Sequence, residues 1–78
     1  MFDVRVQYFA ILREKMGTPS QTVPCAPGTT VDELYHGLFG DFADQVTVSY
    51  AVNRVHVSSD TVLAADDDVV FLPPMGGG

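Results

Sequence analysis

A single cysteine in a chain of 78 residues is the feature that most limits how this sequence can fold. Cys25 has no partner for an internal disulfide, and one thiol with two scattered histidines gives no zinc-ligand pattern. A chain this short buries only ~60% of the surface that its unfolded form exposes. We therefore expect no metal site and one small domain held by an apolar core, for which a hydrophobic fraction of 46% is sufficient.

The net charge of −6 excludes several classes of partner. Phosphate backbones and anionic membrane surfaces repel such a chain, so we expect it to bind neither nucleic acid nor membranes. Residues 32–78 hold eight of the ten acidic residues and one of the four basic ones. A charged partner should therefore be basic and should contact this part of the chain, although an acidic surface can also serve solubility alone.

No segment of the sequence predicts export or membrane insertion. The N-terminus lacks the basic region of a signal peptide, and no apolar run approaches the ~18 residues of a membrane span. We therefore expect a cytoplasmic protein.

The first part of the chain predicts two strands with a short helix between them. Residues 2–9 alternate apolar and polar side chains, as a half-buried strand does. Residues 10–16 are good helix formers, and Gly17 follows them. Residues 20–25 predict a second strand, and Pro24, which has no amide proton, places at least the end of that strand at a sheet edge.

The clearest local signal is a helix that starts after residue 30. Thr30 and Glu33 fit a capping box, in which each side chain bonds to the backbone amide of the other residue. Apolar residues then recur at the spacing of one face of an amphipathic helix that ends near Gly40, and they are Val31, Leu34, Tyr35 and Leu38.

The remaining residues predict further strands. Residues 46–52 and 55–57 are strand candidates on either side of a turn, and clusters of turn residues follow at 58–60 and 66–68. Residues 69–72 form a continuous apolar run that is typical of a central strand. One main helix packed on one face of a small mixed sheet of four to five strands is an α+β arrangement.

The side chains offer no convincing catalytic group. Cys25 could pair with His36 or His56 as thiolate and imidazole, but a lone cysteine is most often an inert apolar residue. Residues 66–68 lack the alternate spacing of a calcium loop and predict a solvated turn. We therefore expect that the chain is not an enzyme on its own.

The end of the sequence is its most unusual part. Pro73 and Pro74 predict a stiff, extended exit from the sheet, so that residues 1–74 form the domain and residues 75–78 a flexible tail. Three glycines provide a slender backbone that can enter a narrow channel and that ends in an unhindered carboxylate. An enzyme can activate such a carboxylate with ATP. A frayed or engineered terminus is the other interpretation of these residues.

Several segments resemble the small, ubiquitin-like subunit of molybdopterin synthase, and together they span essentially the whole chain. They are Tyr8-Phe9-Ala10, the Thr30-x-x-Glu33 helix start, Val52-Asn53 before Val55, and the ending from Asp67 to Gly78. The family ending has an acidic turn, a strand, two prolines, two linker residues and a terminal Gly-Gly. Gly77 and Gly78 occupy the last two positions, which makes Gly76 a linker residue. Asp66 stands where the family usually has a glycine, and this departure puts the geometry of that turn in doubt.

The resemblance implies a ubiquitin-like β-grasp fold and the function of a sulfur carrier in molybdenum cofactor biosynthesis. In the family, an E1-like enzyme uses ATP to adenylate the terminal carboxylate, here that of Gly78, and sulfur transfer then makes a thiocarboxylate. The tail, with Gly76 and Gly77 in support, delivers the sulfur to a pterin precursor in the large catalytic subunit of molybdopterin synthase. The carrier itself binds no cofactor, and the resemblance implies a heterotetramer with the large subunit.

The strand pattern also predicts a partner-binding surface. If the apolar side of the first strand faces the helix together with Val69 and Phe71, the opposite side of the sheet carries an apolar patch beside the tail. With the residues of the tail exit, this surface comprises Phe9, Val70, Leu72, Pro73, Pro74 and Met75. Ordinary surface hydrophobes, or a core face assigned to the wrong side, are the alternative.

Three functions stay open on the sequence alone. Besides the molybdopterin carrier, the residues fit a related carrier for thiamin or cysteine synthesis, or a ubiquitin-like modifier that joins Gly78 to lysines. The double proline favours the molybdopterin carrier, and a single lysine, Lys15, disfavours a modifier that polymerises. The third function, after the molybdopterin carrier and the related carrier or modifier, is that of a binding module with an incidental glycine tail.

Overall fold

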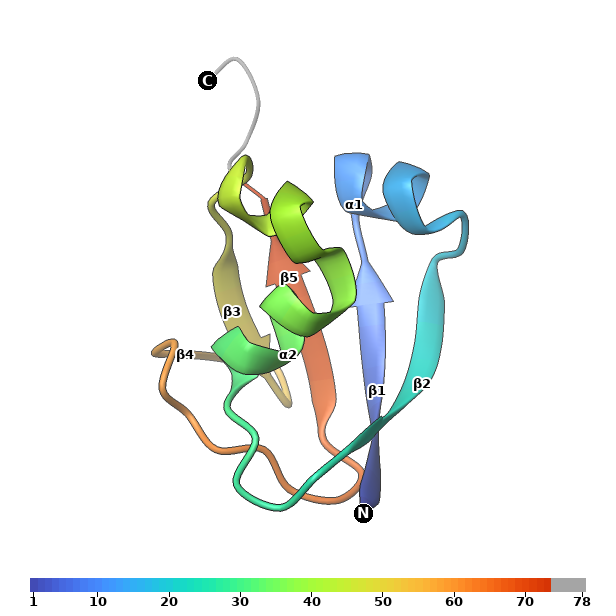
Figure 1. Cartoon of the computed structure of the whole chain (residues 1–78). Helices are drawn as coiled ribbons and strands as arrows, with labels where there is room; N and C mark the ends of the chain where they lie inside the picture. Colours follow the sequence, from blue (N-terminus) through green and yellow to red (C-terminus); the bar gives the residue numbers. More distant parts are fainter. Residues whose placement is uncertain (74–78) are drawn as a thin grey trace.

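A computed structural model describes residues 1–73 of the chain, and these residues form a five-stranded sheet with the main helix across one face (Figure 1). The strands are β1 (Phe2–Tyr8), β2 (Ser20–Cys25), β3 (Ser49–Val52), β4 (Val55–Val57) and β5 (Asp68–Leu72). The short helix α1 (Ala10–Met16) joins β1 to β2. The main helix α2 (Val31–Phe39) and the 3-10 helix η1 (Gly40–Asp44) lie between β2 and β3 in the sequence.

The strand order is β2-β1-β5-β3-β4, which places the last strand in the centre of the sheet. β5 runs parallel to β1 and antiparallel to β3, while the β1–β2 and β3–β4 pairs are antiparallel. The apolar run of residues 69–72 therefore predicted a central strand correctly, and Pro24 lies in an edge strand as expected. With α2 across one face, this is the α+β, β-grasp arrangement, and the sheet has five strands (Figure 1).

Local signals in the sequence determine where the helices begin and end. The predicted capping box is present at the start of α2, where the Glu33 amide donates to Thr30 Oγ1 at 3.2 Å and the Thr30 amide donates to Glu33 Oε1 at 2.9 Å. Gly17 ends α1 with a φ of 75°, and its amide donates to the Arg13 carbonyl at 2.9 Å. Glycine adopts this left-handed conformation without steric cost.

The core lies between α2 and the sheet. Aromatic rings dominate its centre, where the Tyr35 and Phe71 ring centroids are 5.1 Å apart and the Tyr8 and Phe39 centroids are 5.8 Å apart. The Tyr8 hydroxyl donates to Gln21 Oε1 at 2.7 Å, so this buried ring keeps a polar partner. The largest fully buried side chains are those of Tyr8, Tyr35, Phe71, Leu12, Val4, Val6, Val31 and Val69.

The third strand is shorter than the sequence predicts, since it begins at Ser49 and not at Val46. The Val46 carbonyl accepts a hydrogen bond from the Tyr35 hydroxyl at 2.7 Å, which ties this segment to α2. The prediction of a strand over residues 46–52 was therefore wrong for its first part. The pattern of apolar residues did not reveal this long-range contact.

Three smaller boundaries also differ from the prediction. The first strand ends at Tyr8, because Phe9 serves as the N-cap residue of α1. β5 begins at Asp68, inside the predicted turn, where the Asp68 carbonyl accepts from the Asn53 amide at 2.8 Å. At the end of α2, Leu38 is only half-buried while Phe39 is buried, because the chain turns into η1 at this point.

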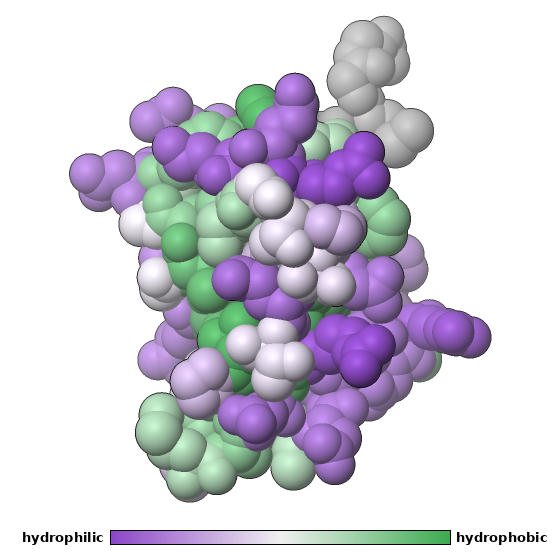
Figure 2. Space-filling view, turned by 90° about the vertical axis from the view of Figure 1, so that its right-hand side faces the viewer, coloured by the Kyte–Doolittle hydropathy of each residue, from purple (hydrophilic) through white to green (hydrophobic). Residues whose placement is uncertain are grey.

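Figure 2 shows the side of the molecule formed by α1 and β2. Most of this surface is polar, but an apolar strip runs between β2 and α2. The strip is the outer opening of a groove whose lining is described below.

The turn between β3 and β4 fixes the start of β5. Asn53 has a φ of 53°, its Nδ2 donates to Asp67 Oδ1 at 2.9 Å, and its Oδ1 accepts from the Asp68 amide at 2.9 Å. Asp66 has a φ of 66°, and its amide donates to the Asp3 carbonyl at 2.8 Å. Aspartate tolerates this left-handed conformation better than most residues, so the turn survives at the position where the family usually has glycine.

We expect Asn53→Ala to lower the free energy of unfolding by about 2 kcal/mol, because it removes two exposed hydrogen bonds and places alanine in the left-handed region. Asn53→Gly keeps that conformation available and loses only the side-chain bonds, so it should cost about 1 kcal/mol. Urea unfolding of the two variants measures the difference. Wild-type stability in Asn53→Ala would show that the turn does not hold β5.

Candidate functional site

The candidate site consists of the face of the sheet opposite α2 and the base of the tail. Of the predicted site residues, the structure describes Phe9, Val70, Leu72 and Pro73. The remaining predicted residues lie outside the described residues, and they are Pro74, Met75, Gly76, Gly77 and Gly78.

The alternation of β5 divides its side chains between the two faces of the sheet. Val69 and Phe71 are fully buried against α2, whereas Val70 and Leu72 are half-buried on the opposite face. Val70 lies between Gln7 of β1 and Ala51 of β3, and Leu72 pairs with Ser49. A row of apolar side chains therefore leads along β5 to Pro73 at the base of the tail.

Phe9 extends this surface from the neighbouring strand. Tyr8 pairs with Phe71, so the next residue, Phe9, comes beside Leu72 in the parallel register. The Phe9 side chain is 45% exposed, and its carbonyl accepts from the Leu12 amide at 3.0 Å in the first turn of α1. We call the surface formed by Phe9, Val70, Leu72 and Pro73 the outer apolar patch.

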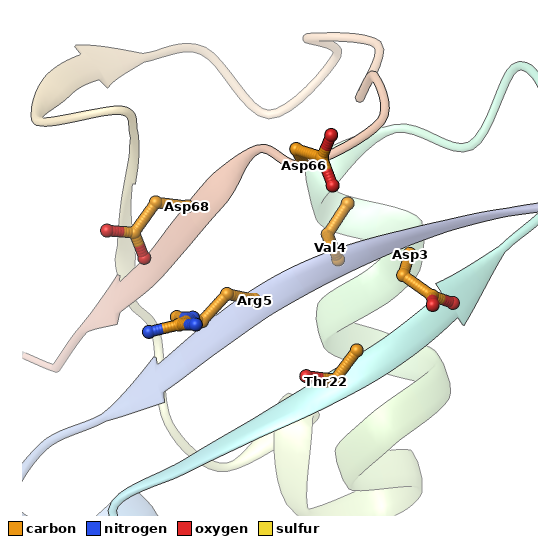
Figure 3. Close-up of a pocket in the computed structure, with 6 residues that line it drawn as sticks. All are labelled: Asp3, Val4, Arg5, Thr22, Asp66 and Asp68. Atoms are coloured by element: carbon orange, nitrogen blue, oxygen red, sulfur yellow. The ribbon is translucent and has the colours of Figure 1, made fainter.

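The same face of the sheet becomes charged toward the start of β5. A pocket of about 310 Å³ is lined by Arg5 and Asp68 at one end and by Asp3 and Asp66 at the other (Figure 3). Gln7 Nε2 donates to both carboxylate oxygens of Asp68, at 2.9 and 3.1 Å. The pocket therefore holds three carboxylates and one guanidinium, and its net negative charge suits contact with a basic surface.

The reactive side chains considered from the sequence do not form a site. Cys25 is 3% exposed, and burial together with the nearby Asp3 raises the pKa of its thiol, which disfavours the nucleophilic thiolate. His36 contacts Asp32 and Asp44 instead. Within residues 1–73, no group of three or more metal-ligating side chains is placed to hold an ion, and no helix is long and apolar enough to cross a membrane.

A polar network on α2 joins the helix to the sheet. The Tyr50 hydroxyl donates to Asp32 Oδ1 at 2.7 Å, and burial together with this bond raises the pKa of Tyr50. His36 Nδ1 lies 3.0 Å from the Asp32 carbonyl oxygen and 3.3 Å from Asp32 Oδ1, while Nε2 lies 3.8 Å from Asp44 Oδ1. The hydrogen bond to the backbone carbonyl and the two carboxylates raise the pKa of His36 above its usual 6.5.

This shift predicts a pH dependence of stability. Because the pKa of His36 is higher in the folded chain than in the unfolded one, protonated His36 stabilises the fold below pH 6.5, and this contribution is lost as the pH rises through the folded pKa. We expect an NMR titration of the ring to give a pKa above 6.5 and Asp44→Asn to lower it. His36→Gln should remove this part of the pH dependence, and a ring pKa at or below 6.5 would contradict the assignment.

The burial of Ala51 and the contact between Asn53 and Asp67 depend on neighbours that the sequence pattern does not reveal. Ala51 is 7% exposed although it lies on the outer face, because Val70 and the paired strand β4 flank it. The Asn53 clamp on Asp67 joins two turns that are far apart in the sequence. Asn53-Arg54 between two apolar runs was the available signal for a tight hairpin turn.

Comparison with known proteins shows the family to which the chain is similar. Residues 6–78 match the ThiS family. The molybdopterin synthase sulfur carrier subunit of Mycobacterium tuberculosis is 35% identical over 83 residues, and the match covers all of both chains.

Solved structures share the fold over almost the whole chain. A Pyrococcus furiosus protein named as molybdopterin converting factor subunit 1 is 28% identical, with a TM-score of 0.77 over 96% of this chain and 100% of that one. Subunit 1 of the molybdopterin-converting factor of Helicobacter pylori, solved in complex with subunit 2, is 18% identical with a TM-score of 0.63. The match covers 99% of this chain and 100% of that one. At that identity the second likeness concerns the fold alone.

Proposed function

Because the chain belongs to the ThiS family, we propose that it is the sulfur carrier subunit of a molybdopterin synthase. The observation that carries this proposal is the 35% identity to a sulfur carrier subunit, which spans the full length of both chains. The family match runs to residue 78 and therefore includes Gly77 and Gly78. The tail thus belongs to the part of the chain that resembles known carriers.

The chemistry that we propose takes place at the main-chain carboxylate of Gly78. A carboxylate is a poor electrophile, so an E1-like activating enzyme first transfers AMP from ATP to it and releases pyrophosphate. A sulfur nucleophile then attacks the acyl carbon and displaces AMP, which leaves a C–S bond where a C–O bond was. The absence of a side chain at Gly76, Gly77 and Gly78 keeps access to this carbon open from both enzymes.

The folded domain positions this group against the large catalytic subunit. We propose that the outer apolar patch binds that subunit while the tail enters its active site and sulfurates a pterin precursor. The patch ends at Pro73, the last described residue, so binding there holds the residue that precedes the tail against the large subunit. The negative pocket on the same face favours a large subunit with basic residues around its channel.

The carrier function also implies an oligomeric assembly, a user of ATP and a cellular location. We expect a heterotetramer in which carriers sit on a dimer of large subunits, with no cofactor bound to the carrier itself. ATP is used by the activating enzyme alone. The cytoplasm, where ATP is abundant, is the proposed location.

Mass spectrometry of the intact chain tests the function. After incubation with its native activating enzyme, ATP and a sulfur donor, the chain should gain one sulfur in place of one oxygen. Adding the large subunit and the pterin precursor should return the mass to its starting value. A chain that gains sulfur but is discharged only by an enzyme of thiamin or cysteine synthesis would move the proposal to that pathway. A chain that gains none would refute it.

A further inference from the structure

The β2 edge of the sheet and the groove beside it lie apart from β5 and its outer apolar residues. β2 is the outermost strand and is separated from β5 by β1, so this edge does not take part in the proposed docking of the outer apolar patch. Two independent features of the edge, its backbone groups and its apolar groove, suggest that it has a partner of its own.

The first feature is a set of unpaired backbone groups. The Tyr8 amide donates to the Pro19 carbonyl, and this bond sets the alternation of the β1–β2 ladder. Odd-numbered residues of β2 therefore bond to β1, and the amides of Ser20 and Thr22 and the carbonyls of Thr22 and Pro24 point away from the sheet. The remaining edge carbonyl, that of Ser20, accepts from the Thr18 hydroxyl at 3.0 Å.

The second feature is an apolar groove of about 270 Å³ between this edge and α2, seen as the apolar strip in Figure 2. Its walls include Val23 and Cys25 of β2 and Leu34, Gly37 and Leu38 of α2. Glu33 is the one charged residue in the lining, and its carboxylate already accepts from the Thr30 amide. Because most of its other lining residues are apolar, the groove favours apolar side chains in a ligand.

We propose that the β2 edge binds an extended segment of a partner protein, which pairs with β2 as an additional strand and inserts alternate apolar side chains into this groove. An extended backbone is the ligand that satisfies both donors and both acceptors of the edge, because its own amides and carbonyls have the same spacing. The alternation of a strand places every second side chain on the helix side, where Val23 and the groove lie. The backbone groups of the edge specify the extended backbone of the ligand, and the groove specifies its apolar side chains.

The charges near the groove add a preference for its two ends. Glu33 lies in the lining near the start of α2. Beyond Leu38, at the other end of the helix, the Lys15 ammonium lies 5.0 Å from the centroid of the Phe42 ring. A bound segment should therefore carry a basic residue near Glu33 and an acidic residue near Lys15.

A second copy of this chain fits the edge less well. Antiparallel pairing of two β2 strands about Thr22 would bring Gln21 of one copy beside Val23 of the other, which offers an amide to an apolar groove. Each copy also carries a net charge of −6. The extended segment that binds the β2 edge therefore belongs to a different protein.

The test uses the full chain labelled with nitrogen-15 and a synthetic peptide that alternates valine and threonine between a terminal lysine and a terminal glutamate. The same composition in reverse order is the second probe, because the two orders correspond to antiparallel and parallel addition. We expect one of the two to bind saturably and to slow hydrogen exchange of the Ser20 and Thr22 amides. The Gln21 and Val23 amides, which already bond to β1, should change much less.

Two variants at one position separate groove binding from effects on folding. Gly37 has open space where a side chain would project, so Gly37→Leu fills the groove while it improves helix propensity. It should weaken peptide binding at least about tenfold, whereas Gly37→Ala should leave the affinity within about twofold. Thr22→Pro removes an edge donor and should also weaken binding.

Three results would overturn the proposal. They are no saturable binding of either peptide, binding that Gly37→Leu leaves intact, and protection that appears on β5 instead of β2. If the chain sediments as a dimer without peptide and its Ser20 and Thr22 amides are protected in that dimer, the occupant of the edge is a second copy and not a partner protein. None of these outcomes depends on sulfur transfer, so this test stands apart from that of the carrier function.

Discussion

A chain shortened by Gly77 and Gly78 will gain no sulfur, yet it will unfold at the temperature of the intact protein. The deletion removes the proposed reactive carboxylate and moves the new terminus back by two residues. Misplacement of a reacting group by even ~1 Å can cost about a hundredfold in rate, so loss of activity should be complete. The fold should not respond, because every residue of the described core lies before Pro73. Intact mass and thermal unfolding measured on one preparation check both parts.

A matched pair of substitutions distinguishes tail length from tail shape. Gly76→Ala and Gly77→Ala add the same methyl group to neighbouring residues, and the chain keeps its length. The resemblance makes Gly76 a linker and Gly77 part of the terminal pair. We expect Gly76→Ala to retain sulfur transfer and Gly77→Ala to slow it at least about tenfold. Equal effects would show that the boundary between linker and active tail is wrongly placed. Normal activity of the deleted chain would show that the carboxylate of Gly78 is not the reactive group.

The parts of the fold that could be predicted are those with local causes. The capping box of Thr30 and Glu33, the end of α1 at Gly17 and the edge position of Pro24 each depend on a few neighbouring residues. The strict alternation of β1 predicted which of its side chains are buried. Such features need no knowledge of the rest of the molecule.

The parts that could not be predicted depend on contacts between distant residues. The Tyr35 hydroxyl donates a hydrogen bond to the Val46 carbonyl, and the Asn53 side chain donates one to Asp67 between two turns. The groove beside β2 also has this origin, because α2 packs so that Leu34 and Leu38 border the strand without covering it. Hydrophobic periodicity gives the face on which a residue lies, but it does not give how closely two elements approach.

The candidate site shows the same division. Alternation along β5 predicted that Val70 and Leu72 face away from α2, and the structure places them there. Their half-buried state depends on neighbours such as Ala51, which the sequence pattern does not bring beside Val70. Whether this surface binds a large subunit is a question of binding, and a single substitution tests it.

Leu72→Asp will abolish the complex with the large subunit and leave the domain folded. Leu72 lies on the outer face of β5 beside Ser49, at the end of the patch nearest the tail. If the complex covers this side chain, the variant buries an unpaired carboxylate, which costs about 3–5 kcal/mol and weakens binding at least about a hundredfold. Folding should lose only about 1 kcal/mol, the span of strand propensities, because the side chain does not enter the core.

Val55→Asp is the matched control for this result. It makes the same change of charge on β4, where Val55 is 61% exposed and lies outside the outer apolar patch. Titration calorimetry with the large subunit should give nearly the wild-type affinity for Val55→Asp and no measurable binding for Leu72→Asp. Equal losses in both variants would assign the effect to added negative charge. Such a general electrostatic effect weakens as the salt concentration rises, whereas the cost of burying a carboxylate does not. Wild-type binding of Leu72→Asp would place the large subunit on another face of the domain.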